Sequence, residues 1–232
     1  MEGEVELNKD NPTHVNVLIA TPGALLHSGY VKSLLDTGNT LNKLGISWAF
    51  LNEGSSHVAS ARESTLNSGD EQEVFNSKPV KGFFTYNKIM WIDSDITWTP
   101  EDFMKLYLSD KDVIVGAYLL TNGDVPAYRK ILKEPLKFDE VKNATELIQL
   151  EAAGMGFMCV KQGVFESLSR PWFQSAFGSV FVGDKLFEFN IIGEDISVCK
   201  RITDKGFEIW LDPTIRLVHT KQMRLTWEGP TP

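Results

Sequence analysis

One stretch, Lys88–Ile96, constrains the fold more than any other part of the chain. A short apolar run, Ile89–Ile92, ends abruptly in two carboxylates one residue apart, Asp93 and Asp95. This pattern is typical of a buried strand whose carboxyl end opens into a site. Because residues i and i+2 of an extended or turning backbone project to the same side, the two carboxylates can face one target.

Two like charges placed so close together are unfavourable unless a cation lies near them. Carboxylate oxygens are suitable ligands for Mg²⁺ or Mn²⁺, and substrate phosphates and water usually fill the remaining positions around such ions. A polar turn with a capping aspartate would show the same three residues, and so short a motif is weak evidence. The stretch therefore predicts a metal–diphosphate site and leaves the polar turn as an alternative.

The amino-terminal part alternates strand and helix patterns. Val15–Ala20 is an expected strand that ends at the turn Thr21–Gly23, a candidate wall for a nucleotide. Ile46–Leu51 is the next expected strand, so the β-α-β order predicts a parallel pair. Between them, helical spacing predicts an apolar face formed by Val31, Leu34, Leu35, Leu41 and Leu44.

A polar helix or lid is expected over Ser55–Ser68, and it carries Arg62, whose planar fork suits phosphate or a carboxylate cluster. On its own, such an arginine is more often a solvated surface residue. Gly69–Asn87 is mostly polar and aperiodic, which predicts a loop. No element is assigned between Leu119 and Glu151, where an excursion with a small antiparallel ribbon is the modest interpretation.

Helix and strand signals continue after the acidic pair. Thr99–Asp102 has the features of a helix start, and Asp112–Tyr118 those of a buried strand. Two glycines, Gly154 and Gly156, precede another apolar strand and allow close backbone approach. A short helix is expected over Gln162–Leu168.

The carboxyl-terminal part adds another acidic pair, Glu194 and Asp195, at the start of a helix that ends near Gly206, although acidic residues at this position also have a purely structural role. Two last strands, Phe207–Leu211 and Ile215–Val218, are expected on either side of an Asp-Pro turn. His219 follows directly after the last strand, where it is a candidate third ligand for the metal site predicted at Asp93 and Asp95.

Composition narrows the possible functions. The 232 residues suit one domain over residues 14–222, with a polar lead-in at 1–13 and a tail at 223–232. Acidic residues exceed basic ones, 31 to 23, which argues against broad electrostatic capture of nucleic acid. Cys159 and Cys199 lie in apolar surroundings and are expected to be buried free thiols. With no apolar run of membrane-spanning length and no signal-peptide pattern, a cytoplasmic location is expected.

Taken in order, Asp93-Ser94-Asp95, Gly154-Met155-Gly156-Phe157, Gly193-Glu194-Asp195 and His219 resemble the metal-dependent glycosyltransferases of the GT-A fold. Compact family-2-like members of bacteria and phages are the most similar group. The resemblance implies an α/β fold with a Rossmann-like mixed sheet, mostly parallel, and flanking helices.

The resemblance also implies roles for individual residues. Asp95, Asp93 and His219 would hold Mn²⁺ or Mg²⁺, and Asp195 would take the proton from the acceptor hydroxyl with Glu194 holding the acceptor or the loop. The nucleotide-sugar side would include Thr21, Pro22, Gly23, Arg62, Asp93, Ser94 and Lys221. Arg62 matches an arginine that often precedes an asparagine, but Glu63 stands in that next place.

Three functions are compatible with these residues. The first is transfer of a sugar from a nucleotide donor, most often a UDP-sugar in this family, to a hydroxyl acceptor. The second is a phage-type enzyme acting on hydroxymethylated bases in DNA, which requires a basic groove. The candidate groove residues are Lys130, Lys133, Lys137, Lys200, Arg201 and Lys205. The third is non-catalytic binding of a sugar nucleotide, which would not require Asp195.

Overall fold

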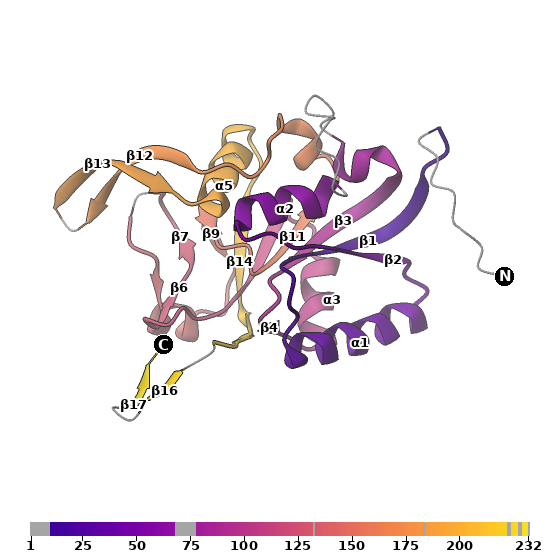
Figure 1. Cartoon of the computed structure of the whole chain (residues 1–232), viewed down its shortest axis with the longest axis horizontal. Helices are drawn as coiled ribbons and strands as arrows, with labels where there is room; N and C mark the ends of the chain where they lie inside the picture. Colours follow the sequence, from indigo (N-terminus) through magenta and orange to yellow (C-terminus); the bar gives the residue numbers. More distant parts are fainter. Residues whose placement is uncertain are drawn as a thin grey trace.

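The structure is a computed structural model that describes residues 10–67, 78–131, 133–182, 184–221, 224–226 and 229–231. A seven-stranded sheet forms its centre, in the order β2-β1-β3-β11-β5-β14-β9 (Figure 1). Five of these strands run parallel to one another, whereas β11 and β9 are antiparallel to their neighbours. The strands are β1 (Thr13–Pro22), β2 (Trp48–Glu53), β3 (Phe84–Ile92), β5 (Val113–Ala117), β9 (Ile148–Leu150), β11 (Phe157–Lys161) and β14 (Ile209–Arg216).

Helices cover both faces of this sheet (Figure 1). Buried residues of α2 and α5 pack in one apolar cluster, and those of α1 and α3 pack in another. The prediction of a mixed, mostly parallel, Rossmann-like sheet with flanking helices is confirmed. The helices are α1 (Ser28–Lys43), α2 (Val58–Asn67), α3 (Pro100–Leu108), α4 (Phe138–Asn143) and α5 (Glu194–Asp204), with 3₁₀ turns η1 (Pro79–Gly82) and η2 (Phe165–Ser167).

Strand β3 is an interior strand of the sheet, between β1 and β11, and its side chains alternate between the two clusters. Trp91 packs on the α2/α5 side, and Met90 and Ile92 pack on the α1/α3 side. Residues 89–92 are fully buried. A strand that is covered on both faces has a continuous apolar sequence, and this is why β3 was predicted correctly from the sequence.

Helix α1 forms as expected, and Leu41 and Leu34 pack on the core, but the rest of the predicted apolar face was wrong. Leu35 is 63% exposed and Leu44 is 58% exposed, whereas Ser33 and Thr37 are buried. The reason is Trp98, whose backbone carbonyl accepts the Ser33 hydroxyl at 2.7 Å and whose indole N–H donates to Thr37 at 2.9 Å. Satisfied hydroxyls can be buried at little penalty, so the polar stripe faces the core.

Three other boundaries differ from the expectations. The expected loop over Gly69–Asn87 was wrong at its end because β3 already begins at Phe84; residues 68–77 lie outside the described part. The helix expected over Gln162–Leu168 is only the turn η2, since Gly163 has a φ of +95°, which a helix does not accommodate. Both departures come from backbone geometry that apolar periodicity does not encode.

The two strands expected around the Asp-Pro turn are one strand, β14. Its register shifts between Asp212 and Arg216, and the Asp212 carboxylate accepts the backbone N–H of Thr214 at 2.9 Å. The turn is therefore a bulge inside a strand. β15 (Val218–His219) follows and pairs with β4 (Ile96–Thr97), which places His219 opposite Ile96.

The unassigned segment from Leu119 to Glu151 contains one small antiparallel ribbon, β6–β8, in line with the modest expectation. It also contains β7, which pairs with β10 just after the segment, and α4 and β9, which were not expected. Hairpin β12–β13 and ribbon β16–β17 lie after it. The short elements are β6 (Asp124–Val125) with β8 (Leu136–Lys137), β7 (Ala127–Tyr128) with β10 (Ala152–Ala153), β12 (Ala176–Val182) with β13 (Lys185–Ile192), and β16 (Arg224–Thr226) with β17 (Gly229–Thr231). In the described residues, no helix is long and apolar enough to cross a bilayer.

Both cysteines are buried free thiols, as predicted. Burial raises the pKa of Cys159 and of Cys199 to about 12. Since the thiolate is the reactive form, we expect neither to react with iodoacetamide in the native protein at pH 8, and both to react in denaturant. Mass spectrometry of the alkylated protein measures this, and rapid native labelling of either residue would contradict its burial.

Candidate functional site

The site forms where the carboxyl ends of β1 and β3 lie side by side. The two strands are parallel, with Ala20 opposite Trp91, so the turn at Gly23 and the acidic pair emerge at the same edge of the sheet. Gly23 has a φ of +123°, a value that favours glycine. The antiparallel strand β11 begins beside them, and the N–H of Asp93 donates to the carbonyl of Gly156 at 3.0 Å.

Asp93 and Asp95 each have a cationic partner of their own. Asp93 accepts Nη2 of Arg62 at 2.9 Å. Asp95 accepts Nζ of Lys221 at 2.9 Å and lies 3.3 Å from Nε2 of His219. Each carboxylate is therefore paired with its own cationic side chains. The partner of Asp93 comes from the amino-terminal part of the chain, and the partners of Asp95 come from the carboxyl-terminal part.

Arg62 is buried between two acidic pairs, at the inner side of α2. Its Nε lies 3.7 Å from Glu194, and only 5% of its side chain is exposed. Among the described residues, Nε and Nη1 find no hydrogen-bond partner. Burial alone would lower the pKa of Arg62, but Asp93, Glu194 and Asp195 outweigh it and raise that pKa. Donors without partners in a buried cation leave capacity for a further acceptor.

Asp195 lies in the first turn of α5, where its carboxylate accepts its neighbour's N–H, from Ile196, at 2.8 Å. Burial raises the pKa of Asp195 above its ordinary value, against the opposing attraction of Arg62. A carboxylate whose proton affinity is raised is a stronger base, which suits removal of a proton from a hydroxyl.

His219 is held in one tautomer. Its Nδ1 donates to the carbonyl of Leu119 at 2.8 Å, which leaves Nε2 facing Asp95. Metal-binding histidines commonly donate their second ring nitrogen to a carbonyl in this way. Two ligands at right angles on one ion, with bonds of about 2.1 Å, lie about 3.0 Å apart, close to the spacing observed here.

The electrostatics of this pair keep Asp95 ionised and favour a protonated His219. Partial burial would raise the pKa of Asp95, but the hydrogen bonds from His219 and Lys221 and their charges lower it to about 2. The hydrogen bond to Asp95 raises the pKa of His219. Within the described ranges, no group of three or more His, Cys, Asp or Glu side chains is arranged to hold a metal ion. Asp95 and a neutral His219 could supply two ligands, and an ion such as Mg²⁺ would take the others from substrate phosphates and water.

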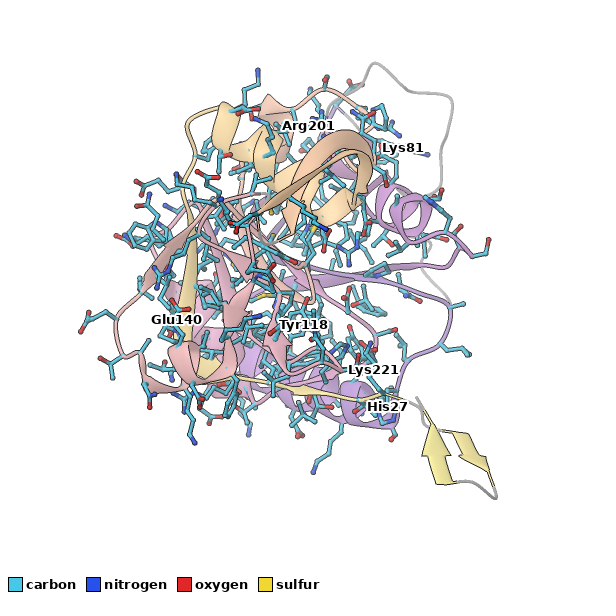
Figure 2. The ribbon with its side chains drawn as sticks, turned by 90° about the vertical axis from the view of Figure 1, so that its left-hand side faces the viewer. His27, Lys81, Tyr118, Glu140, Arg201 and Lys221 are labelled. Atoms are coloured by element: carbon cyan, nitrogen blue, oxygen red, sulfur yellow. The ribbon has the colours of Figure 1, made fainter. Side chains whose placement is uncertain are left out.

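A cavity of about 300 Å³ opens beside these residues. Lys221, one of its lining residues, is labelled in Figure 2. Ser55 and Ser56 also contribute to its wall, and their place before α2 was the only sequence signal that pointed to them. The predicted residues among those lining it are Pro22, Gly23, Arg62, Asp93, Ser94, Asp95 and Lys221.

Thr21 is a predicted site residue that does not line this cavity. Its side chain is fully buried, and its hydroxyl is hydrogen-bonded to that of Tyr30. The carbonyl of Thr21 accepts the side-chain amide of Asn52 at 2.8 Å, and so does that of Gly23. Thr21 therefore supports the end of β1 without presenting its side chain to a ligand. Glu63 likewise faces away, with its carboxylate bonded to Arg170 at 2.7 Å.

Tyr118 is a site residue that the sequence analysis missed. Its hydroxyl accepts the N–H of Gly156 at 3.2 Å, and its ring meets that of His219 edge-on at 5.2 Å between centroids. A Cβ on Gly154 or Gly156 would lie closer than 3.0 Å to Tyr118. The two glycines are thus needed for this tyrosine to pack. Its position at the end of an expected strand was the available signal.

The basic residues considered for a DNA groove are mostly engaged in other contacts. Four of the six are paired within the protein: Lys130 with Glu151, Lys137 with Asp124, Lys200 with Asp204, and Arg201 with the carbonyls of Pro171 and Trp172. A groove that follows a phosphate backbone presents such side chains to the ligand, so these pairings argue against one here.

No known protein family model matches the sequence, and no curated protein matches it either. Several solved structures resemble the fold, among them the following three. The chain superposes on A197 from STIV with a TM-score of 0.55 at 18% identity, covering 93% of this chain and 91% of that one. For the catalytic domain of Drosophila beta1,4-galactosyltransferase 7, in complex with xylobiose, the TM-score is 0.49 at 12% identity, covering 90% of this chain and 71% of that one. For GalNAc-T7 with UDP, GalNAc and Mn²⁺, the TM-score is 0.45 at 11% identity, covering 94% of this chain and 45% of that one. The TM-score with A197 shows that this chain has the same fold as A197.

Proposed function

We propose that the chain transfers a sugar from a nucleotide-sugar donor, most readily a UDP-sugar, to a hydroxyl acceptor. The observation that carries this proposal is the cavity at the carboxyl ends of β1 and β3, which gathers an acidic pair, a buried arginine and a lysine. In open α/β sheets, ligands bind at such an edge. The order of the motifs along the chain, which resembles that of GT-A glycosyltransferases, supports the same function.

The residues divide into a donor side and an acceptor side. Arg62 and Lys221 offer cationic donors to the diphosphate, while Asp95 and His219 would hold Mn²⁺ or Mg²⁺. Such an ion offsets the charge that builds on the departing diphosphate. Asp195 would accept the proton of the acceptor hydroxyl as the new glycosidic bond forms, and Glu194 would keep Arg62 oriented.

A thermal-shift experiment tests the donor side. We expect UDP with Mn²⁺ to raise the melting temperature by about 5 °C or more at a concentration near one hundred times Kd, because a ligand that binds only the folded state stabilises it. EDTA should remove the shift. Asp95→Asn should remove it as well, whereas Asp110→Asn, outside the cavity, should not. Equal protection by UDP in EDTA would remove the metal from the proposal.

The same experiment separates a UDP-sugar donor from other nucleotides. CDP, GDP and ADP with Mn²⁺ serve as comparisons at equal concentration. The absence of protection by all four diphosphates would contradict a nucleotide-sugar site, whereas stronger protection by another diphosphate would change only the identity of the donor.

A further inference from the structure

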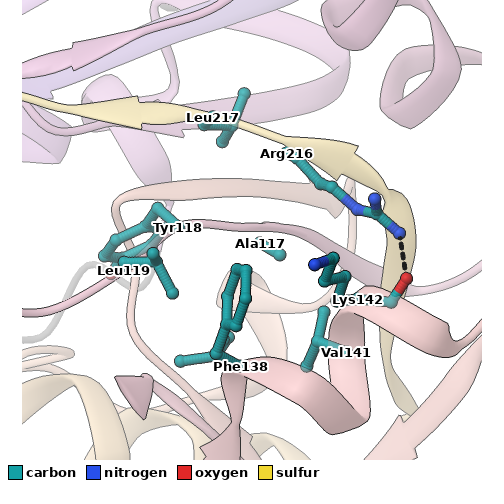
Figure 3. Close-up of a pocket in the computed structure, with 9 residues that line it drawn as sticks. Ala117, Tyr118, Leu119, Phe138, Val141, Lys142, Arg216 and Leu217 are labelled. Carbon is teal, nitrogen blue, oxygen red and sulfur yellow. Dashed lines mark hydrogen bonds between the residues drawn. The ribbon is translucent and has the colours of Figure 1, made fainter. Parts of the chain in front are cut away.

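A second cavity, of about 200 Å³, lies between α4, the end of β5 and the end of β14 (Figure 3). Its wall is mainly apolar: Ala117, Tyr118, Val125, Phe138, Val141 and Leu217 all contribute to it. It shares no lining residue with the cavity at the acidic pair. It is therefore a second cavity, although Tyr118 in its wall also contacts the ring of His219 on the side of the acidic pair.

The size of this cavity suits one ring. An apolar cavity of about 150 Å³ in another protein binds benzene, so about 200 Å³ accommodates an aromatic ring with a short substituent. Phe138, which is 45% exposed, and Leu119, which is 40% exposed, leave the cavity open to solvent. A ligand can thus enter without unfolding of the core.

Two cations lie at the rim. The Lys142 ammonium is 5.3 Å from the centre of the Phe138 ring. Arg216 is held by two backbone carbonyls: Nη2 donates to Lys142 at 2.7 Å, shown as a dashed line in Figure 3, and Nε donates to Pro213 at 3.0 Å. The structure thus places a fixed guanidinium and an ammonium on a flexible stem beside an apolar cavity, a combination that favours anions.

We propose that this cavity binds a small aromatic carboxylate. The ring would enter between Phe138 and Tyr118, where aromatic side chains favour edge or offset contacts, and the carboxylate would remain at the rim beside Lys142 and Arg216. Phe138, Val141 and Lys142 all come from α4, and Arg216 bonds the backbone of the same helix. The six-residue helix α4 thereby supplies three of the nine lining residues.

The probe for this proposal is benzoate, compared with benzyl alcohol and benzylammonium, which keep the ring and change the charge. Calorimetry and ligand-observed NMR on the whole chain measure the affinity. We expect saturable one-to-one binding of benzoate, roughly tenfold tighter than benzyl alcohol, with benzylammonium weakest, because charge-assisted hydrogen bonds add about that much.

Two variants at exposed positions separate the ring from the charge. Phe138→Ala should weaken benzoate binding about fivefold or more, through loss of the aromatic wall. Lys142→Gln should weaken it about threefold and reduce the preference over benzyl alcohol, the scale of a solvent-exposed ion pair. The matched control is Lys43→Gln, an exposed lysine at the end of α1, which should leave the affinity unchanged.

Three outcomes would overturn the proposal. They are absence of saturable benzoate binding up to roughly 10 mM, equal benzoate affinity in Phe138→Ala and the unmodified chain, and binding of benzylammonium as tight as that of benzoate. Because Phe138 and Lys142 are partly or largely exposed, circular dichroism should show that both variants fold. A change in benzoate affinity can then be attributed to the substituted side chain.

Discussion

Asp195→Asn is expected to lower turnover by roughly a hundredfold or more while leaving the affinity for the nucleotide donor nearly intact. The amide has almost the same shape but cannot accept the proton of the acceptor hydroxyl, and loss of a general base has this magnitude. Asp195 does not line the donor cavity, and its pKa is raised by burial, so its removal should not disturb donor binding. Steady-state kinetics with a UDP-sugar and an acceptor measure turnover, and calorimetry measures donor affinity.

The matched control is Asp204→Asn, at the other end of the same helix. Asp204 is exposed and pairs with the exposed Lys200 at 2.8 Å, so turnover in this variant should match that of the unmodified chain. An Asp195→Asn variant with normal turnover but weakened donor affinity would reassign this residue to binding. An equal loss of turnover in both variants would mean that the substitutions disturb α5 and do not remove a catalytic base.

The strands were the part of the fold most accessible from the sequence. The run before Asp93 is apolar because both faces of β3 are covered, and an uninterrupted apolar stretch followed by carboxylates is visible without any structure. Apolar runs also located β1, β5 and β11, alternation located β2, and the β-α-β order predicted the parallel pair β1–β2. The pairing of β1 with β3, which brings Gly23 to Asp93, is seen in the structure. Strand ends therefore indicated the place of the site.

Helix faces were less accessible because hydrogen bonds can override apolar periodicity. The core side of α1 contains Ser33 and Thr37, which are buried because Trp98, 65 and 61 residues later, bonds both. No local pattern encodes that partner. The ribbons after Leu119 are also held by pairings between short segments, which carry too few residues to show a period.

The partners of the acidic pair were beyond sequence reasoning for a related reason. Spacing of two residues suggested that Asp93 and Asp95 face one cation, but each binds a different side chain from a distant element. The sequence alone favoured a solvated surface for Arg62, and the packing of α2 against β1 shows that it is buried. A buried charge needs a partner, so the structure turns Arg62 and Asp93 from two candidates into one unit.

Asp93→Ala is therefore expected to destabilise the fold by about 3–5 kcal/mol, because it removes the nearest counter-ion of the buried Arg62 guanidinium and leaves Glu194 at 3.7 Å. Only 5% of the Arg62 side chain is exposed, so solvent compensates its charge poorly. Urea denaturation followed by tryptophan fluorescence measures the free energy of unfolding. Glu140→Ala is the matched control, since the Arg129–Glu140 pair is about half exposed and its loss should change the free energy by less than about 1 kcal/mol.

The double variant Asp93→Ala with Arg62→Met tests whether the loss of stability in Asp93→Ala comes from the buried guanidinium that has lost its counter-ion. If it is, removing the guanidinium as well should restore roughly 1 kcal/mol or more relative to Asp93→Ala alone, because a buried apolar side chain needs no counter-ion. Additive losses in the double variant would mean that the two side chains act independently. Such a result would also remove the reason for assigning Arg62 to the acidic pair, and leave its unpartnered nitrogen atoms as ligands for the donor phosphates alone.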